Sequence, residues 1–512
     1  EHTERVPSRL ELFFDLVFVA IAHQLSEAVA ENASAAGLAK FILIFYPTWS
    51  LWSEFRNFVN ASGTDDVLQR LAVLWLMALL RFIGYTANAS AIQLGTHEST
   101  EASTGGVHVV LGNVLAGAAG EHSTGEAVAS HYARDPALVT ATAFFLVAKF
   151  SRVALLIWYA VALPLFRSSF LLQIAFQMFN FFIYLPLLVV RSPSAIITLA
   201  TLGMATDYLL RYLAGVPLIL NNKMTKRVLK RITPEDLEAR SRNVDPTVSR
   251  THFTNRILSK IHQATNIEHF IERTAAFVVI VLGEVVLSVV YHATRADVGF
   301  KNIYGSAVSG LIIAFNFCWL YFDAECSHTF VHAMRRHWFT SITFTNLHFP
   351  LCASLILVSA ATSRMTQHTE EVTSAIRWYF GGGLGVALIS MALIGATHRG
   401  LDPTGTSRLG RFTQLGFRVA VGAILICLPL SDLSPLHLLG TSAGLTSFLV
   451  VEETYGKLRR GEPLAKPSAA EQDAIDAREL SEERPDATRI DSGLESGSME
   501  SGLKGMKIRG TA

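Results

Sequence analysis

Ionisable side chains stand inside the longest apolar stretches of this sequence. In a membrane-spanning helix such a side chain costs roughly 2.5–3.5 kcal/mol on insertion scales, so it usually faces the bundle interior, pairs with another charge or lines a water-filled path. The candidates for an ion or substrate path, and hence for binding a cation or a proton, are Asp15, Glu284, Glu11, His23, Glu54, Asp323 and His348.

Spacing along the first apolar stretch places these groups relative to one another. Glu11 and Asp15 lie four residues apart and so share one helical face, and Ser26 returns to nearly the same face. His23 lies about 12 Å beyond Asp15 along a helix and about 80° around it. We therefore expect a polar stripe that faces the bundle, without a direct contact between Asp15 and His23.

A second set of residues is expected to supply charge partners. Its members are Arg9, Arg81, Lys149, Arg152, Asp207, Arg211 and Arg273. The spacing of Asp207 and Arg211 predicts a pair within one helix. Lys149 and Arg152 have no neighbouring acid, so their partners must come from other helices, for which Asp15, Glu54 and Glu284 are the candidates. Glu272 and Arg273 stand at the edge of an apolar stretch and are expected to anchor it.

The elements that must position these residues are transmembrane helices. Hydrophobic residues make up 50% of the chain, charged residues only 17%, and the mean hydropathy is +0.35. Because a helix needs roughly 20 apolar residues to cross a bilayer, we predict an all-α, polytopic membrane protein with about twelve spans. The spans are expected near 10–31, 36–55, 69–94, 137–164, 169–190, 194–220, 268–291, 303–322, 338–361, 374–397, 412–430 and 435–454.

Loop charges predict how the chain is oriented. Lys and Arg collect in the segments that are cytoplasmic if the N-terminus is inside, which predicts cytoplasmic N- and C-termini. The predicted parts are a first six-helix repeat at 1–221 with an outer loop at 96–136, a basic cytoplasmic linker at 222–265, a second six-helix repeat at 266–455 and a disordered cytoplasmic tail at 456–512. The protein would reside in the plasma membrane or an endomembrane.

Two Asn-Ala-Ser tripeptides add a test of this orientation. Asn32 falls in the first outer loop and is a predicted glycosylation acceptor on a eukaryotic secretory route, whereas Asn60 falls on the cytoplasmic side and is not.

The two halves also share residues at corresponding helices. Arg9, Phe13 and Asp15 in the first predicted span correspond in type to Arg273, Phe277 and Glu284 in the seventh, with the second acid set deeper. Six spans per half would give both halves one orientation. Such parallel repeats commonly hold the substrate or ion path between them.

These residues also carry a family resemblance. The runs ELFFDLVFV from Glu11, ERTAAFVVIVLGE from Glu272 and WLYFD from Trp319 resemble the bacterial and fungal low-temperature-requirement A (LtrA) family, over roughly residues 8–455. That resemblance implies a twelve-span membrane protein and no particular chemistry. The run RLELFFDLVF from Arg9 is also similar to the Arg-x-x-x-Phe-Ser-Asp motif of an endolysosomal potassium-channel family, with Phe14 in place of the serine.

Other sequence features point to packing. Four cysteines without CxxC spacing predict neither a disulfide framework nor a zinc site, and no metal or other cofactor is expected. The loosely spaced acids and histidines from Asp323 to His332 are likewise not expected to bind a metal. GxxxG spacing in 381–385 and 440–444 predicts close helix packing.

Three functions remain open at this point. The first is a transporter or ion-conducting protein in which buried carboxylates bind a cation or proton between the repeats. The second is a non-transporting receptor or scaffold, in which the charges only hold helices together. The third is a membrane-embedded enzyme, for example a lipid-modifying one, that uses Asp15, His23 or His348 as acid and base. It is the least expected of the three, because the sequence has no nucleophile motif and no His-Asp pair at catalytic spacing. The expected partner is the lipid bilayer and not nucleic acid, and the oligomeric state stays open.

Overall fold

The computed structural model of the protein describes residues 9–62, 67–77, 85–92, 135–162, 167–231, 266–293, 302–323, 330–367, 372–402 and 405–459. Most of the predicted outer loop at 96–136, the predicted linker beyond Arg231 and the predicted tail beyond Arg459 lie outside these residues. So does Arg81, together with the side chain of Arg9.

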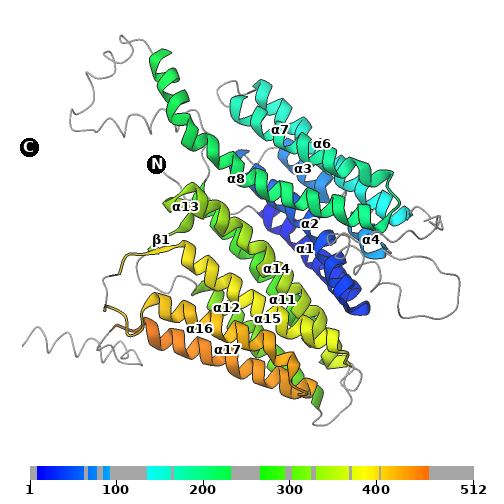
Figure 1. Ribbon diagram of the computed structural model, residues 1–512, viewed down its shortest axis with the longest axis vertical. Coiled ribbons are helices and arrows are strands. Elements are labelled where there is room, and N and C mark those ends of the chain that lie inside the picture. The colour runs from blue at the N-terminus through cyan, green and yellow to red at the C-terminus, as the bar shows by residue number, and fades with distance from the viewer. Residues whose placement is uncertain are drawn as a thin grey trace, which may run out of the picture. The chain divides into compact units, whose positions relative to one another are not determined.

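Helices make up almost all of the described chain (Figure 1). The helical elements of the first half are α1 (Arg9–Glu31), α2 (Ala35–Ser62), α3 (Val67–Met77), α4 (Tyr85–Ala91), α6 (Pro136–Ala162), α7 (Arg167–Tyr184), η4 (Leu185–Leu188) and α8 (Pro193–Arg231). Those of the second half are α11 (Ile267–Ala293), α12 (Asn302–Phe322), α13 (Ala333–Arg336), α14 (Trp338–Gln367), α15 (Ser374–Thr397), α16 (Arg411–Cys427), η5 (Leu428–Leu430) and α17 (Pro435–Lys457).

Nine helices in the described part are long and apolar enough to cross a membrane. They include α1, and each of them overlaps a span that the sequence predicted. The helices α2 and α17 have sufficient length but are not among the nine, because of their composition. The predicted span at 69–94 is described only as α3 and α4, with the residues between them undescribed. These helices make the chain a multi-pass membrane protein, and within the described residues nine of the twelve predicted spans are long and apolar enough to cross.

Local sequence explains where the first helices begin and end. The stretch from Arg9 to Glu31 contains neither Pro nor Gly, so nothing interrupts α1. The hydroxyl of Ser34 then accepts a hydrogen bond from the Gly37 amide at 3.0 Å, which caps the start of α2. Helix α2 continues to Ser62, beyond the predicted end of that span at 55, and α8 likewise continues past its predicted end into the region assigned to the linker.

The helices α1 and α11, far apart in sequence, pack side by side and run in the same direction (Figure 1). Asp15 contacts Arg273 near their N-terminal ends, and His23 contacts Glu284 further along both helices. Two membrane helices that run in the same direction are separated by an odd number of crossings, and the sequence predicts five spans between these two.

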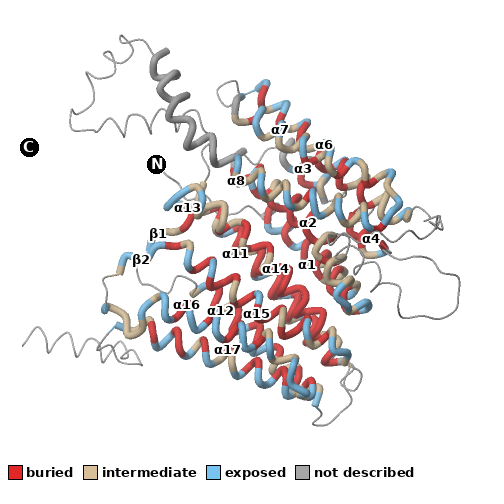
Figure 2. Tube along the Cα trace, viewed as in Figure 1, coloured by how far each residue is buried: buried red, intermediate tan, exposed pale blue. Residues whose placement is uncertain are grey.

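The buried core lies on α14, α15 and the facing sides of α1 and α11 (Figure 2). Helix α14 packs against α1, α11 and α15, while α8 is largely exposed. Aromatic rings fill the space where α1, α2 and α11 meet. The ring centroids of Trp52 and Phe277 lie 4.1 Å apart, and those of Phe18 and Phe277 lie 5.4 Å apart.

Close helix packing was predicted for the GxxxG motifs at 381–385 and 440–444, and the structure shows it for only one of them. A Cβ atom on Gly381 would lie 2.6 Å from the carbonyl oxygen of Leu425, and one on Gly385 would collide with the carbonyl of Gly422. The predicted close packing is therefore confirmed for α15 against α16. For Gly440 and Gly444 it is wrong, because a Cβ on either would meet no described atom within 4 Å.

A short strand pair joins two loops of the second half. Strand β1 (Phe330–Val331) pairs antiparallel with β2 (Arg399–Gly400), with Phe330 opposite Gly400. This pairing brings the loop after α12 against the loop after α15.

Candidate functional site

A buried ion-pair cluster, here called the Arg273 network, joins α1 to α11. Both of its acids are on α1. The Arg273 guanidinium donates to Asp15 Oδ1 at 2.8 Å and to Glu11 Oε2 at 3.1 Å. The Nε2 atom of His269 lies 2.8 Å from the same Glu11 oxygen, and Trp52 Nε1 donates to Asp15 Oδ1 at 3.0 Å. These five side chains define the network, and each acid in it contacts a permanent cation.

The expectation that Arg273 anchors a membrane boundary is wrong. Its side chain is fully buried, and so is that of His269 one helical turn earlier. The sequence signal for His269 was its spacing of four residues from Arg273, which puts both on one face of α11. That face turns toward Glu11 and Asp15 and not toward the lipid surface.

Arg56 is a further buried cation, although the predicted second span ended at residue 55 and left it in the following loop. Its Nη1 donates to Thr274 Oγ1 at 2.8 Å, and its guanidinium lies 3.9 Å from the ring centroid of Phe270 and 4.8 Å from that of Trp52. The sequence assigned Arg56 to a cytoplasmic segment after the second span. Because α2 continues to Ser62, the residue lies within the helix and points into the bundle.

A second polar group, here called the Glu284 site, lies further along the same pair of helices. Glu284 is fully buried on α11. Its Oε1 atom lies 2.9 Å from His23 Nδ1, 3.2 Å from Ser26 Oγ and 3.4 Å from Ser359 Oγ. Its Oε2 atom is buried and has no hydrogen-bond partner among the described residues. Glu284, His23, Ser26 and Ser359 define the site, which α1, α11 and α14 position.

His23 connects this buried carboxylate to an exposed one. The His23 side chain is 38% exposed, and its Nε2 atom lies 3.5 Å from Oε1 of Glu27, whose side chain is 65% exposed. The imidazole therefore contacts a buried acid with one nitrogen and approaches a solvent-accessible acid with the other. Neutral imidazole can donate at one nitrogen and accept at the other, which suits it to pass a proton.

An aromatic layer separates the Glu284 site from the Arg273 network. Phe18 lies between Asp15 and His23 on α1, and Phe277 lies between Arg273 and Glu284 on α11. Trp52, which belongs to the Arg273 network through its bond to Asp15, packs beside them from α2 and forms the network's edge of this layer. All three rings are buried. Because Asp15 and His23 are separated by about 12 Å of helix rise, the two polar groups do not touch.

Lys149 pairs with Glu54, one of the three acids that the sequence offered as candidates. Its amine forms an ion pair with Glu54 and donates to Ser50 Oγ at 3.1 Å. Arg152 differs, because no described acid accepts a hydrogen bond from it. Its Nη1 atom is buried without a partner, and its guanidinium lies 5.0 Å from the ring centroid of Phe58.

The predicted pair on α8 is present. Arg211 Nη2 donates to Asp207 Oδ2 at 2.9 Å. Tyr46 donates to the same carboxylate, and so does Ser50 at 3.2 Å. This acid is thus already occupied by a cation and two hydroxyls.

The two remaining path candidates lie away from both polar groups. His348 is buried, with Nδ1 2.7 Å from the carbonyl oxygen of Phe344 and Nε2 3.0 Å from the Tyr321 hydroxyl. Both of its nitrogens are therefore satisfied by structural partners. Asp323 lies just beyond the end of α12 and forms an ion pair with Lys457 at 3.1 Å.

Arg418 also proves to be paired. Its guanidinium forms an ion pair with the buried Glu453 of α17 and donates to the carbonyl oxygen of Leu320 at 2.9 Å. Arg418 lies in the predicted span 412–430, and Glu453 stands near the end of the last one, 435–454. Only the packing of α16 against α17 shows that the two side chains meet.

A neutral histidine pair lies outside the spans, at the strand pair. The rings of His332 and His398 are 4.4 Å apart, and His398 Nδ1 accepts a hydrogen bond from the Ala333 amide at 3.0 Å. Burial lowers the pKa of His332 to about 4. Burial, with His332 and Arg411 nearby, lowers the pKa of His398 to about 3. In the described residues, no group of three or more His, Cys, Asp and Glu side chains is arranged to hold a metal ion.

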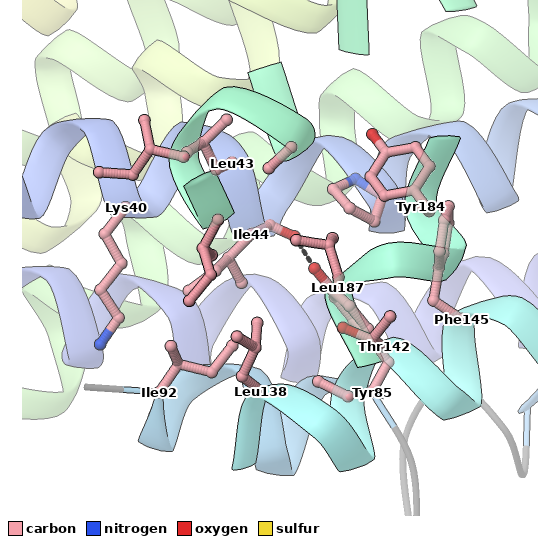
Figure 3. A pocket seen from close by; sticks show the side chains of 15 residues that line it. Lys40, Leu43, Ile44, Tyr85, Ile92, Leu138, Thr142, Phe145, Tyr184 and Leu187 are labelled. Atoms are coloured by element: carbon pink, nitrogen blue, oxygen red, sulfur yellow. Dashed lines mark hydrogen bonds between the residues drawn. The ribbon is translucent and has the colours of Figure 1, made fainter. Parts of the chain in front are cut away.

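A mostly apolar pocket lies between α2, α4, α6, η4 and α8 (Figure 3). Leu43, Ile44 and Phe145 are in its wall, and Lys40 is the single charged residue among those that line it. The hydroxyl of Tyr85 donates to the Ile44 carbonyl at 2.8 Å. The described residues that line the pocket include no acid.

The two Asn-Ala-Ser tripeptides differ in accessibility. Asn32 is exposed in the turn after α1. Asn60 is buried, and its side-chain amide donates to the Asn266 carbonyl at 2.7 Å. Of the two, only Asn32 is accessible to a glycosylating enzyme.

Comparison with known proteins gives one match. The sequence model of the family described as bacterial low temperature requirement A protein (LtrA) matches residues 6–448, which span both halves of the chain. No curated protein and no solved structure matches the chain.

Proposed function

This chain belongs to the bacterial low temperature requirement A (LtrA) family, and from that premise we propose that it is a transporter or ion-conducting protein. In this proposal a proton or small cation crosses the membrane by way of the Glu284 site. The multi-pass helical architecture supplies the path, and the buried carboxylate supplies the group that holds the charge.

The observation that carries this proposal is the environment of Glu284. It is fully buried at the α1–α11 interface, and His23 is the only titratable side chain among the described residues that contacts it. Every other predicted path acid in the described chain contacts Lys or Arg. A carboxylate without a permanent cation can take up a mobile one, whereas a paired carboxylate must first break its ion pair.

The arrangement of α1 and α11 supports two parallel six-helix repeats. Each helix opens one half, the two run in the same direction, and each supplies an acid to a basic partner on the other. Asp15 on α1 faces Arg273, and Glu284 on α11 faces His23. This exchange is expected when the first helices of two parallel repeats meet at the axis between them. We propose twelve spans with both termini cytoplasmic.

An orientation test uses two positions in the predicted loops. Cysteines introduced at Ser123 and at Ser241 of a cysteine-free variant are expected to differ in their reaction with an impermeant thiol reagent. In intact cells only the cysteine at 123 should react. Equal labelling at the two positions would contradict the proposed orientation.

A non-transporting scaffold is the second candidate. The observation that favours it is the pairing of most buried charges, because an ion pair can hold two helices in register without moving anything. Under that interpretation Glu284 and His23 form one more structural contact. An enzyme receives no such support from the geometry.

Flux measured in proteoliposomes separates the two candidates. The wild-type protein is expected to move protons or alkali cations down an imposed gradient, and Glu284→Gln is expected to reduce this flux to the level of empty vesicles. Glu272→Gln is the matched control, because Glu272 is an exposed acid on the same helix. It should keep the wild-type flux. Equal flux in the two variants, or none in the wild type, would favour the scaffold.

A further inference from the structure

The Glu284 site has a chemistry that distinguishes the proton from other cations. We propose that the proton is the transported species and that Glu27 and His23 relay it to Glu284 from the exposed end of α1. This inference rests on the proposed function and specifies its substrate.

The three groups lie in a row that begins at the surface and ends in the core. Glu27 is largely exposed, His23 is half-buried, and Glu284 is fully buried. The first step joins Glu27 Oε1 to His23 Nε2 across 3.5 Å, and the second joins His23 Nδ1 to Glu284 Oε1 across 2.9 Å. The second distance is that of a hydrogen bond, and the first needs only a small side-chain shift, which the exposure of both groups permits.

The transfer balances without any further reactant. A proton leaves the carboxyl group of Glu27 and bonds to His23 Nε2, which makes the ring an imidazolium. The proton on His23 Nδ1 then passes to Glu284 Oε1, so the ring is again neutral and carries its hydrogen on Nε2. One proton has moved from Glu27 to Glu284. The ring returns to its first tautomer by exchange with water at its exposed edge.

The same site suits a metal cation poorly. Hard cations take six or more oxygen ligands, whereas Glu284, Ser26 and Ser359 supply only a few. The imidazole nitrogen that faces Glu284 Oε1 would also have to move away to admit an ion. A proton needs neither a coordination shell nor space.

The charged surroundings of the relay are simple among the described residues. His23 and Glu27 are on α1, and Glu284 faces them from α11. From α14 the contacting side chain is Ser359, which does not titrate. Toward the N-terminal ends of the two helices the next charged groups are Asp15 and Arg273, which lie behind the aromatic layer of Phe18, Trp52 and Phe277. Proton release toward that side therefore requires these rings to move. In the other direction α1 ends at the exposed acid Glu31.

The test measures proton entry into proteoliposomes that contain a pH-sensitive dye, with potassium and valinomycin present to clamp the voltage. His23→Ala is expected to lower the initial rate at least tenfold, and external imidazole should restore most of it. Glu27→Gln is expected to slow entry severalfold. Imidazole should not rescue Glu284→Gln, because the acceptor is missing. His437→Ala, which removes an exposed histidine on α17, is the control and should match the wild type.

Three outcomes would overturn the relay. A flux of sodium or potassium that requires Glu284 but is unchanged in His23→Ala would leave the proposed function intact and make the substrate a metal cation. Full activity in His23→Gln, which keeps a hydrogen bond but cannot accept a proton, would make His23 a positioning residue. Absence of any ion flux in the wild type would contradict both the relay and the proposed function.

Discussion

The Arg273 network and the Glu284 site both lie where α1 meets α11, and they differ in whether a guanidinium is among the partners of the acid. In each, a buried carboxylate on one helix contacts a basic side chain on the other. In the network the base is a guanidinium, which stays charged at any physiological pH, whereas at the Glu284 site it is an imidazole. Both acids are buried, so burial does not distinguish them. The basic side chain beside each acid determines whether its negative charge is permanently paired or can exchange a proton.

This difference suggests a division of labour along α1 and α11. The network fixes the two helices against each other at their N-terminal ends. Glu284 at its site and Asp15 in the network each leave one carboxylate oxygen without a hydrogen-bond partner among the described residues, so only the basic partner distinguishes the two acids. The predictions that follow test whether the two regions respond as differently as their partners imply.

The largest effect is expected from removal of the permanent cation. Arg273→Met leaves Glu11 and Asp15 buried without it, and breaking such a pair costs about 3–5 kcal/mol of unfolding free energy. Chemical unfolding in detergent, followed by tryptophan fluorescence, measures the loss. Arg377→Met on α15 is the control, because Arg377 is partly exposed. Equal stability of the two variants would show that the network does not hold the helices together.

A second effect concerns histidines without an acid beside them. His332 and His398 have folded pKa values of about 4 and about 3, below the value of 6.5 that applies to unfolded histidine. Their contribution is fully present above pH 6.5, and falling pH removes it, because the unfolded chain takes up protons first. The expected loss is about 1.4 kcal/mol per pH unit for each histidine, between pH 6.5 and about 4.

The measurement compares the wild type with a variant that carries His332→Gln and His398→Gln. The difference in their unfolding free energy should shrink steadily as the pH falls through this window. A difference that stays constant from pH 7 to pH 4 would show that the two rings are not held neutral in the folded protein.

A smaller effect is expected where one hydrogen bond to the network is lost. Trp52→Phe keeps an aromatic ring beside Phe18 and Phe277 but removes the donor to Asp15. The expected loss is about 1–2 kcal/mol, since Arg273 still neutralises the acid. Thermal unfolding compares this variant with Trp378→Phe, which makes the same change at an exposed residue on α15. A larger loss in the control would assign the effect to ring packing.

The smallest change in stability is expected at the Glu284 site. Glu284→Gln leaves an amide that still bonds with His23, Ser26 and Ser359, so the unfolding free energy should change by less than about 1 kcal/mol. Asp15→Asn, which removes one of the two acids that contact Arg273, should lose more. The ion pair of Asp15 with Arg273 accounts for this larger loss. The same unfolding assay compares the two variants. An equal decrease in unfolding free energy would show that the network and the Glu284 site do not differ in their contribution to stability.

The sequence by itself predicted the helical membrane architecture, and it identified most of the charged side chains that are buried between the helices. Apolar stretches of sufficient length fix where helices cross, because a bilayer leaves the backbone few alternatives. The position of Asp207 four residues before Arg211 likewise fixed their pair, since that spacing acts within one helix.

Only the tertiary structure decided which distant charges meet. Asp15, Glu284, His23 and Arg273 were all visible as candidates, but the register of α1 against α11 gave Arg273 to Asp15 and His23 to Glu284. Arg56 joined the interior because α2 continues past its apolar stretch, and Glu453 did so because α17 packs against α16. A side chain's partner depends on rotation and depth of whole helices, and neither follows from the order of residues within one span.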